Sequence, residues 1–201
     1  METSICTTIK SISRDEWEAC RSSKAGGDPF LSYDFFFLLE TSNSVGPKTG
    51  WMPFYIIFKE KNIVVGIIVS FLKNHSQGEY VFDHSWADAY ERSGGNYYPK
   101  LQVAVPFTPV SGERILVQSE YEDKVGEMIS SAKRLVEENN LSSLHITFCN
   151  KSFVSVAKKN NLLVREGIQY HWFNRDYKSF DDFLGSLTYR KRKNIIKERK
   201  Q

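Results

Sequence analysis

Ionisable and aromatic side chains gather in one stretch of the sequence, residues 75–112. An apolar wall raises the pKa of a carboxyl group towards neutrality, where the group can act as a base. A tyrosine or a lysine nearby can hold a substrate oxygen. These properties suit acyl transfer to an amine, because that reaction needs a base for the amine proton and hydrogen-bond donors for the oxyanion.

We predict three base candidates within this stretch: Asp83, His84 and Asp88. Six further side chains are predicted to contact the acceptor or to orient the carbonyl group, namely Glu79, Trp86, Tyr90, Tyr97, Tyr98 and Lys100. The alternative interpretation is structural: the two aspartates cap turns, and the aromatic rings fill a core.

Two other kinds of chemistry fit this stretch poorly. A metal site would draw on His75, Glu79, Asp83 and His84. Their spacing follows no standard ligand pattern, so we predict no metal. Ser85 and Ser111 lack the sequence of a nucleophile elbow, which disfavours a hydrolase triad.

The surrounding elements must position these residues. Apolar or large side chains predict strands over Pro53–Phe58, Ile63–Leu72, Leu101–Phe107, Ile115–Val117 and Val164–Asn174. Alternation of side-chain character predicts two more, over Glu79–Asp83 and Ser142–Cys149. Helical spacing predicts a long helix over Glu122–Asn139, and Ser85–Lys100 is expected to form a loop or an irregular helix. Capping boxes at Ser13–Glu16 and Ser179–Asp182 each predict the start of a further helix. We therefore expect an α+β fold, with one sheet covered by helices.

Charge is spread unevenly over the 201 residues. The formal net charge is +3, but the chain after Ser186 holds seven basic residues and one acid, so this end carries +6 and the rest −3. The basic residues are Arg190, Lys191, Arg192, Lys193, Lys197, Arg199 and Lys200. Three interpretations stay open: a solvated helix end, contact of Arg190–Lys193 with the phosphates of a tRNA, or docking on a further domain.

Cysteine usage and hydropathy bear on the compartment. Three widely spaced cysteines form no CxxC pair and predict neither a zinc knuckle nor a disulfide framework. The longest nearly apolar run, Ile63–Leu72, has ten residues, whereas a membrane span needs about 20. We therefore expect a cytoplasmic protein without a membrane span.

The central stretch also resembles a known family. Residues 78–112 resemble the central motif of the FemAB-like predicted N-acyltransferases, bacterial proteins of peptidoglycan biosynthesis or recognition. Asp28–Phe35, Ser44–Trp51 and Arg190–Ile195 resemble further motifs of that family. The resemblance implies a GNAT-like fold, which is a mostly antiparallel mixed sheet with helices on both faces. It also implies transfer of an acyl or aminoacyl group to a small-molecule or peptide amine.

The acyl donor stays open between acyl-CoA and aminoacyl-tRNA. The founding Fem enzymes use aminoacyl-tRNA, whereas acetyl-CoA-using relatives hold the pyrophosphate on a Gly-rich loop, R/Q-x-x-G-x-G/A, before the central helix. The corresponding stretch here, Gln118–Lys124, has no glycine and three acids. Acids repel phosphates, so this departure disfavours coenzyme A in the usual place.

The resemblance also implies a domain arrangement. The family normally carries two GNAT-like halves, so we expect a first half here: a GNAT-like domain over residues 1–178, then a basic helix over 179–201 that leads towards a second half. The expected protein partners are that second half or a further copy of the chain. The alternative function is a non-catalytic module that recognises cell-wall peptide or tRNA.

Overall fold

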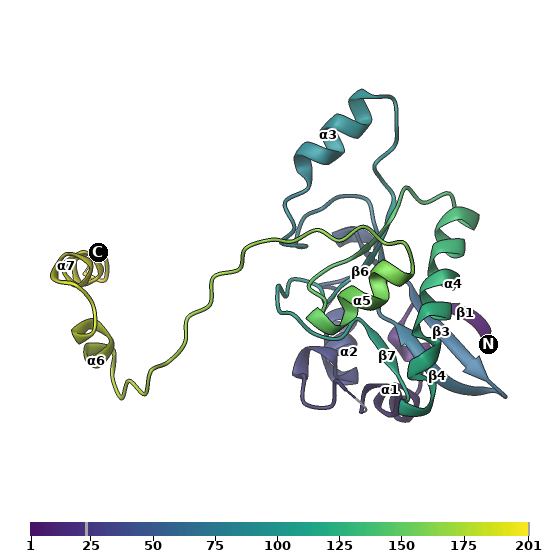
Figure 1. Ribbon diagram of the computed structural model, residues 1–201, viewed down its shortest axis with the longest axis horizontal. Coiled ribbons are helices and arrows are strands. Elements are labelled where there is room, and N and C mark those ends of the chain that lie inside the picture. Colours follow the sequence, from purple (N-terminus) through teal and green to yellow (C-terminus); the bar gives the residue numbers. More distant parts are fainter. Residues whose placement is uncertain (23, 201) are drawn as a thin grey trace. The chain divides into compact units, whose positions relative to one another are not determined.

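The computed structural model describes residues 1–22 and 24–200, and the chain divides into two compact units, Met1–Val164 and Arg165–Gln201. The helices are α1 Arg14–Arg21, α2 Tyr33–Thr41, α3 His84–Arg92, α4 Val125–Glu138, α5 Lys151–Lys159, α6 Phe180–Gly185 and α7 Tyr189–Glu198 (Figure 1). The strands are β1 Glu2–Cys6, β2 Trp51–Pro53, β3 Tyr55–Glu60, β4 Ile63–Ile68, β5 Ser70–Lys73, β6 Lys100–Val103, β7 Ile115–Val117 and β8 Leu144–Ile146. The division at residue 178 that the sequence suggested stays a prediction.

Two four-stranded sheets form the first unit, in the orders β1-β3-β4-β7 and β2-β5-β6-β8. Every strand pair is antiparallel except β6 with β8, which is parallel. A parallel pair needs a long crossover connection, and the chain between β6 and β8 supplies it with α4.

Helices cover both faces of the first sheet because its strands bury both sets of side chains. On β3, Tyr55 and Ile57 belong to one buried cluster, which includes Trp17 of α1 and Phe36 of α2. The alternate residues Ile56 and Phe58 belong to a second cluster, which includes Met128 and Ile129 of α4. Successive side chains on a strand point to opposite faces, so α1 and α2 pack on one face and α4 on the other.

Local signals in the sequence set several helix ends. Ser13 and Glu16 form the predicted capping box, since the Ser13 side chain accepts from the Glu16 backbone and the Glu16 side chain accepts from the Ser13 backbone. Ser179 likewise accepts from the Asp182 backbone at 3.1 Å, although the Asp182 carboxylate accepts from Lys178 instead of Ser179. The first box is confirmed, and the second is confirmed for the Ser179 bond.

Two predicted strands are wrong. Glu79–Asp83 is not a strand, because Gly78 and Tyr80 have positive φ values of 77° and 55° and a regular helix, α3, starts at His84. Val164–Asn174 is rich in large side chains, but a strand also needs a second strand to pair with, and the sheets of the described residues do not include this segment. Of the expected loop or irregular helix over Ser85–Lys100, residues 85–92 belong to the regular helix α3, and residues 93–99 are irregular as expected.

The second unit packs its two short helices around aromatic rings. Phe183 of α6 contacts the rings of Trp172, Tyr177 and Phe180 at centroid distances of 5.6–6.2 Å. Leu184 is buried beside them.

None of the helices in the described part of the chain combines the length and apolarity that a bilayer crossing requires.

Candidate active site

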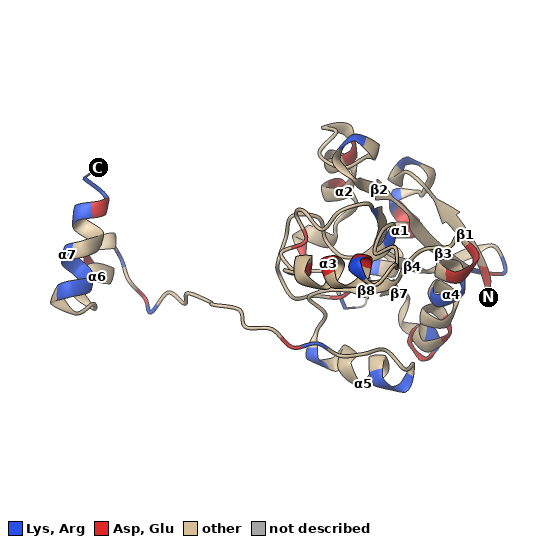
Figure 2. Cartoon of the chain, turned by 90° about the horizontal axis from the view of Figure 1, so that it is seen from above, with Lys and Arg blue, Asp and Glu red and all other residues tan. Residues whose placement is uncertain are grey.

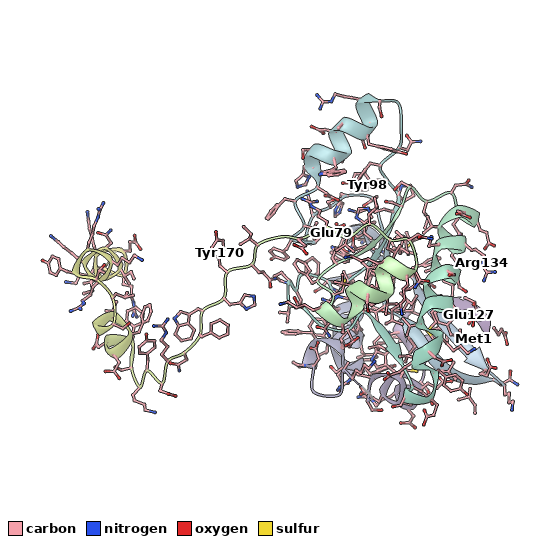
Figure 3. The ribbon with its side chains drawn as sticks, viewed as in Figure 1. Met1, Glu79, Tyr98, Glu127, Arg134 and Tyr170 are labelled. Atoms are coloured by element: carbon pink, nitrogen blue, oxygen red, sulfur yellow. The ribbon has the colours of Figure 1, made fainter. Side chains whose placement is uncertain are left out.

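A buried lysine joins two carboxylates at the foot of α3. The Nζ of Lys100 donates to Glu79 Oε2, Asp83 Oδ2 and Ser76 Oγ at 2.8, 2.8 and 2.9 Å. The side chains of Lys100 and Glu79 are fully buried, and that of Asp83 is 3% exposed. Figure 3 shows Glu79 and Tyr98 below α3.

The register of two strands explains why the group forms. Lys73 ends β5, Lys100 begins β6, and the two residues are paired directly across the antiparallel strands. Like charges opposite one another destabilise a sheet unless other charges compensate them. Residues 74–99 leave the sheet between these two strands and carry Glu79 and Asp83 back over the lysines. Gly78 allows the turn through its positive φ of 77°.

Two tyrosines connect the buried group to its surroundings. Tyr97 donates its hydroxyl hydrogen to Asp83 Oδ2 at 2.8 Å, and the Tyr98 hydroxyl lies 2.8 Å from Ser76 Oγ. Both tyrosines are half-buried. We call Ser76, Glu79, Asp83, Tyr97, Tyr98 and Lys100 the Lys100 cluster.

Burial and charge act differently on the two carboxyl groups. Burial raises the pKa of Glu79, and the neighbouring Lys100 and Lys73 only partly offset this. Burial also opposes ionisation of Asp83, but hydrogen bonds from Lys100 and Tyr97 outweigh it and lower the pKa of Asp83. Asp83 is therefore the more acidic of the two carboxyl groups, and Glu79 is the more basic.

The second lysine is easier to deprotonate than an ordinary one. Burial lowers the pKa of Lys73 from 10.5 to about 7, with Glu79 opposing this and Lys100 adding to it. Its Nζ lies 3.8 Å from the ring centroid of Trp51 and donates to the Gln77 carbonyl at 3.2 Å.

Two residues near this site, Lys73 and Ser76, were not among the residues predicted from the sequence. Lys73 could have been found because it is a lysine at the end of an apolar strand. No local feature of the sequence distinguishes Ser76.

Each carboxylate keeps one oxygen without a donor. Among the described residues, Glu79 Oε1 and Asp83 Oδ1 are buried and have no hydrogen-bond partner. A buried acceptor without a partner costs about 1–3 kcal/mol, so native proteins retain few of them, and functional sites are one place where they occur.

The structure separates the other predicted residues into two groups. Trp86 and Tyr90 line an open hollow together with Tyr97. His84 and Asp88 are exposed, and each lies two residues from Trp86. Two residues correspond to about 200° around a helix, so His84 and Asp88 occupy the opposite face of α3. Of the three base candidates, only Asp83 joins the Lys100 cluster.

The stretch before α4 differs from a phosphate-binding loop. Ser119–Lys124 forms a 3-10 helix, and Glu122 in it pairs with Lys24 of the α1–α2 connection at 2.7 Å. A cavity of about 110 Å³ lies beside this ion pair, and its charged lining residues are two bases and two acids: Arg21, Lys24, Glu113 and Glu122. The charges balance, so the cavity offers no excess positive charge to a pyrophosphate.

The basic end forms α7 in the second unit, and Figure 2 shows the blue basic residues along it. Arg190, Lys191 and Lys193 are exposed. Arg192 instead donates from Nη2 to the carbonyls of Gly185 and Leu187 at 3.0 and 3.1 Å. Three of the four predicted nucleic-acid residues thus face solvent, and the fourth holds α6 and α7 together.

Solved structures of N-acetyltransferases share the fold. The aminoglycoside 6'-N-acetyltransferase AAC(6')-IG from Acinetobacter haemolyticus matches over 88% of this chain and 100% of its own, with 11% identity and a TM-score of 0.50. AAC(6')-Iy with the bisubstrate analogue CoA-S-monomethyl-acetylneamine matches over 87% and 99%, with 12% identity and a TM-score of 0.50. AAC(6')-Iy with CoA matches over 87% and 95%, with 13% identity and the same TM-score. The predicted α+β, GNAT-like fold is confirmed.

The family follows from the sequence itself. The FemAB-like family model, described as peptidoglycan biosynthesis/recognition, matches residues 8–201. This chain belongs to the FemAB-like family, as the resemblance of residues 78–112 predicted. No curated protein matches it.

Proposed function

We propose that this chain transfers an acyl group to an amine and that the Lys100 cluster is its acid–base centre. Family and fold together support an N-acyltransferase. The observation that carries the assignment of the site is the Lys100 ammonium held 2.8 Å from each of two buried carboxylates, both of which keep an unpaired oxygen. Acyl transfer needs such a group, since the attacking amine must lose a proton.

The two carboxylates take different roles in this proposal. Glu79 is the proton acceptor, because burial raises its pKa towards the working range of a base. Asp83 stays ionised and orients Tyr97 and Lys100, which donate to it. His84 and Asp88, the other base candidates from the sequence, would contribute only if the acceptor bound on the opposite face of α3.

We further propose aminoacyl-tRNA as the acyl donor. The acidic turn before α4 and the balanced charges beside it disfavour the pyrophosphate of coenzyme A. The exposed Arg190, Lys191 and Lys193 of α7 suit the phosphates of a nucleic acid. This donor would place the reaction in the cytoplasm, in line with the free cysteines Cys6, Cys20 and Cys149.

Turnover with two donors tests the function. The purified chain is supplied with a panel of small amines and peptides, and with either radiolabelled aminoacyl-tRNA or radiolabelled acetyl-CoA. Amide formation with aminoacyl-tRNA alone is expected. Transfer from acetyl-CoA alone would overturn the donor assignment, and no amide from either donor would leave a binding module as the better description.

Substitutions then test the site. Glu79→Gln keeps the shape of the side chain and removes the base, so kcat should fall by about 100-fold or more. Glu91→Gln is the matched control, because Glu91 is an exposed carboxylate on α3 itself. Asp88→Asn is the competing arm: a larger loss there than in Glu79→Gln would move the base to the opposite face of α3.

A further inference from the structure

An open hollow lies along one face of α3, beside the Lys100 cluster. Its volume is about 440 Å³, and it is lined by Ser85, Trp86, Ala89, Tyr90, Ser93 and Tyr97. This volume falls within the range of roughly 300–1,000 Å³ that small-molecule sites occupy. We call it the α3 hollow. In Figure 1, α3 projects from the sheets of the first unit, so its sides are open to solvent.

One residue belongs to both the hollow and the cluster. Tyr97 lines the hollow, and its hydroxyl donates to Asp83 Oδ2. Because the hydroxyl hydrogen is engaged by Asp83, the lone pairs of the phenol oxygen remain to accept a hydrogen bond from a ligand. Burial and Asp83 both raise the pKa of Tyr97, so it stays a neutral phenol. A ligand that donates an N–H is therefore the chemical match.

The lining also selects the charge of a ligand. Three of the six lining residues are aromatic, and none of the described residues lining the hollow carries a charge. Tyr90 and Tyr97 meet edge to face at 6.2 Å between ring centroids. Aromatic faces attract ammonium groups, and Trp86 and Tyr90 supply two such rings to the hollow, whereas the Tyr97 ring already has the Lys100 ammonium 5.3 Å from its centroid. An anionic ligand would find no cation in this lining.

We infer that the α3 hollow is the acceptor site and that it binds an amine carried on a small, uncharged and partly apolar group. Trp86 and Tyr90 flank the carrier, and Tyr97 accepts a hydrogen bond from the amine. This arrangement places the amine on the side of the hollow where Tyr97 contacts Asp83 of the Lys100 cluster. The inference rests on the proposed function for its biological meaning, but the binding event can be measured without turnover.

The test compares two probes of the same size. The full chain, labelled with ¹⁵N, is titrated at pH 7 with n-butylammonium and, separately, with 1-butanol. Butylammonium should shift the resonances of residues 85–97 and bind about fivefold or more tighter than butanol, which is the scale of a cation–π contact. Equal affinity for the two probes, or shifts confined to other residues, would overturn the inference.

Two variants make the result specific to the hollow. Trp86→Leu should weaken butylammonium binding by about fivefold, because it removes one aromatic face. Phe82→Leu is the control, since Phe82 is an exposed aromatic residue just before α3 that does not line the hollow. Equal losses in both variants would count against the hollow.

The binding and turnover experiments fail separately. Selective butylammonium binding without amide formation from any donor would retain an amine site and reject the proposed function. Amide formation without amine binding at residues 85–97 would retain the function and reject the α3 hollow as the acceptor site.

Discussion

Lys100 and Asp83 are 17 residues apart in sequence, yet the Lys100 ammonium lies 2.8 Å from Asp83 Oδ2 in a fully buried ion pair. This ion pair joins Lys100, the first residue of β6, to Asp83, the residue just before α3. It thereby holds the segment between β5 and β6 against the start of β6. The strand register therefore sets the position of the lysine, and the loop sets that of the carboxylate. The contact that should stabilise the fold is therefore also part of the proposed acid–base centre.

Removing Lys100 should be strongly destabilising. Lys100→Met leaves two carboxylates buried without their cation, and breaking a buried pair in this way costs about 3–5 kcal/mol of unfolding free energy. Urea denaturation followed by circular dichroism measures this loss. Lys48→Met, an exposed lysine in the same unit, should change little. The triple variant Lys100→Met, Glu79→Gln and Asp83→Asn should recover much of the loss, and a failure to recover would mean that packing, not charge, dominates.

Lys73 should make the protein more stable as the pH rises above neutrality. Its pKa is about 7 in the fold and 10.5 for an ordinary lysine, so above pH 7 the unfolded chain binds more protons than the folded chain. The contribution of Lys73 to stability is present above pH 10.5 and is lost progressively as the pH falls from there to about 7. Unfolding free energies measured at pH 6, 7 and 8.5 should rise more steeply for the parent than for Lys73→Met. Identical slopes for the parent and Lys73→Met would contradict a buried Lys73 with a lowered pKa.

Gly78 should tolerate no side chain. A Cβ there would lie 2.7 Å from the Phe107 ring, in addition to the strain of a positive φ of 77°. Gly94 has a φ of 87° but nothing within 4 Å of its Cβ position, so Gly94→Ala isolates the strain, about 1 kcal/mol. Gly78→Ala should cost about 1–3 kcal/mol more in thermal or urea unfolding. Gly78→Ala should also lower activity, because Gly78 directly precedes Glu79. Equal losses of unfolding free energy in Gly78→Ala and Gly94→Ala would refute the clash with the Phe107 ring.

Substitutions at two neighbouring positions of the basic helix α7 should have different effects. Lys191→Ala should weaken tRNA binding and reduce the slope of log Kd against log salt by about 0.7–0.9, with no change in folding. Arg192→Ala should instead loosen the second unit, since it removes the donors to the Gly185 and Leu187 carbonyls. Filter binding over a salt series and hydrogen exchange in α6 measure the two effects. An unchanged salt slope in Lys191→Ala would argue that Lys191 does not touch tRNA.

Much of the fold was predictable because its signals are local. Apolar runs identified the strands β3 and β4, and apolar residues at helical spacing identified α4. Strand predictions failed where a strand-like pattern of residues was present without the conditions that a strand requires. At Glu79–Asp83 two positive φ values turn the chain, and Val164–Asn174 finds no neighbouring strand among the described residues.

The sequence predicted the residue types of the candidate site better than it predicted which individual residues belong to the site. Asp83, Glu79, Tyr97, Tyr98 and Lys100 were all found by their residue type within one polar segment, and the structure brings them together. By residue type, His84 and Asp88 are equally able to act as bases, but helical geometry puts them on the opposite face of α3 from Trp86. Residue type therefore selected candidates, and only the direction of each side chain separated them.

The sequence alone determined the family, the α+β class and the polar segment that holds the candidate site, because motif, periodicity and composition are properties of the chain itself. The tertiary structure decided which charges meet. Lys73 and Lys100 become neighbours only through the pairing of β5 with β6, and this register forces two carboxylates to be buried with them. Distance and desolvation set the pKa values of Glu79, Asp83 and Lys73, and both exist only once the chain has folded.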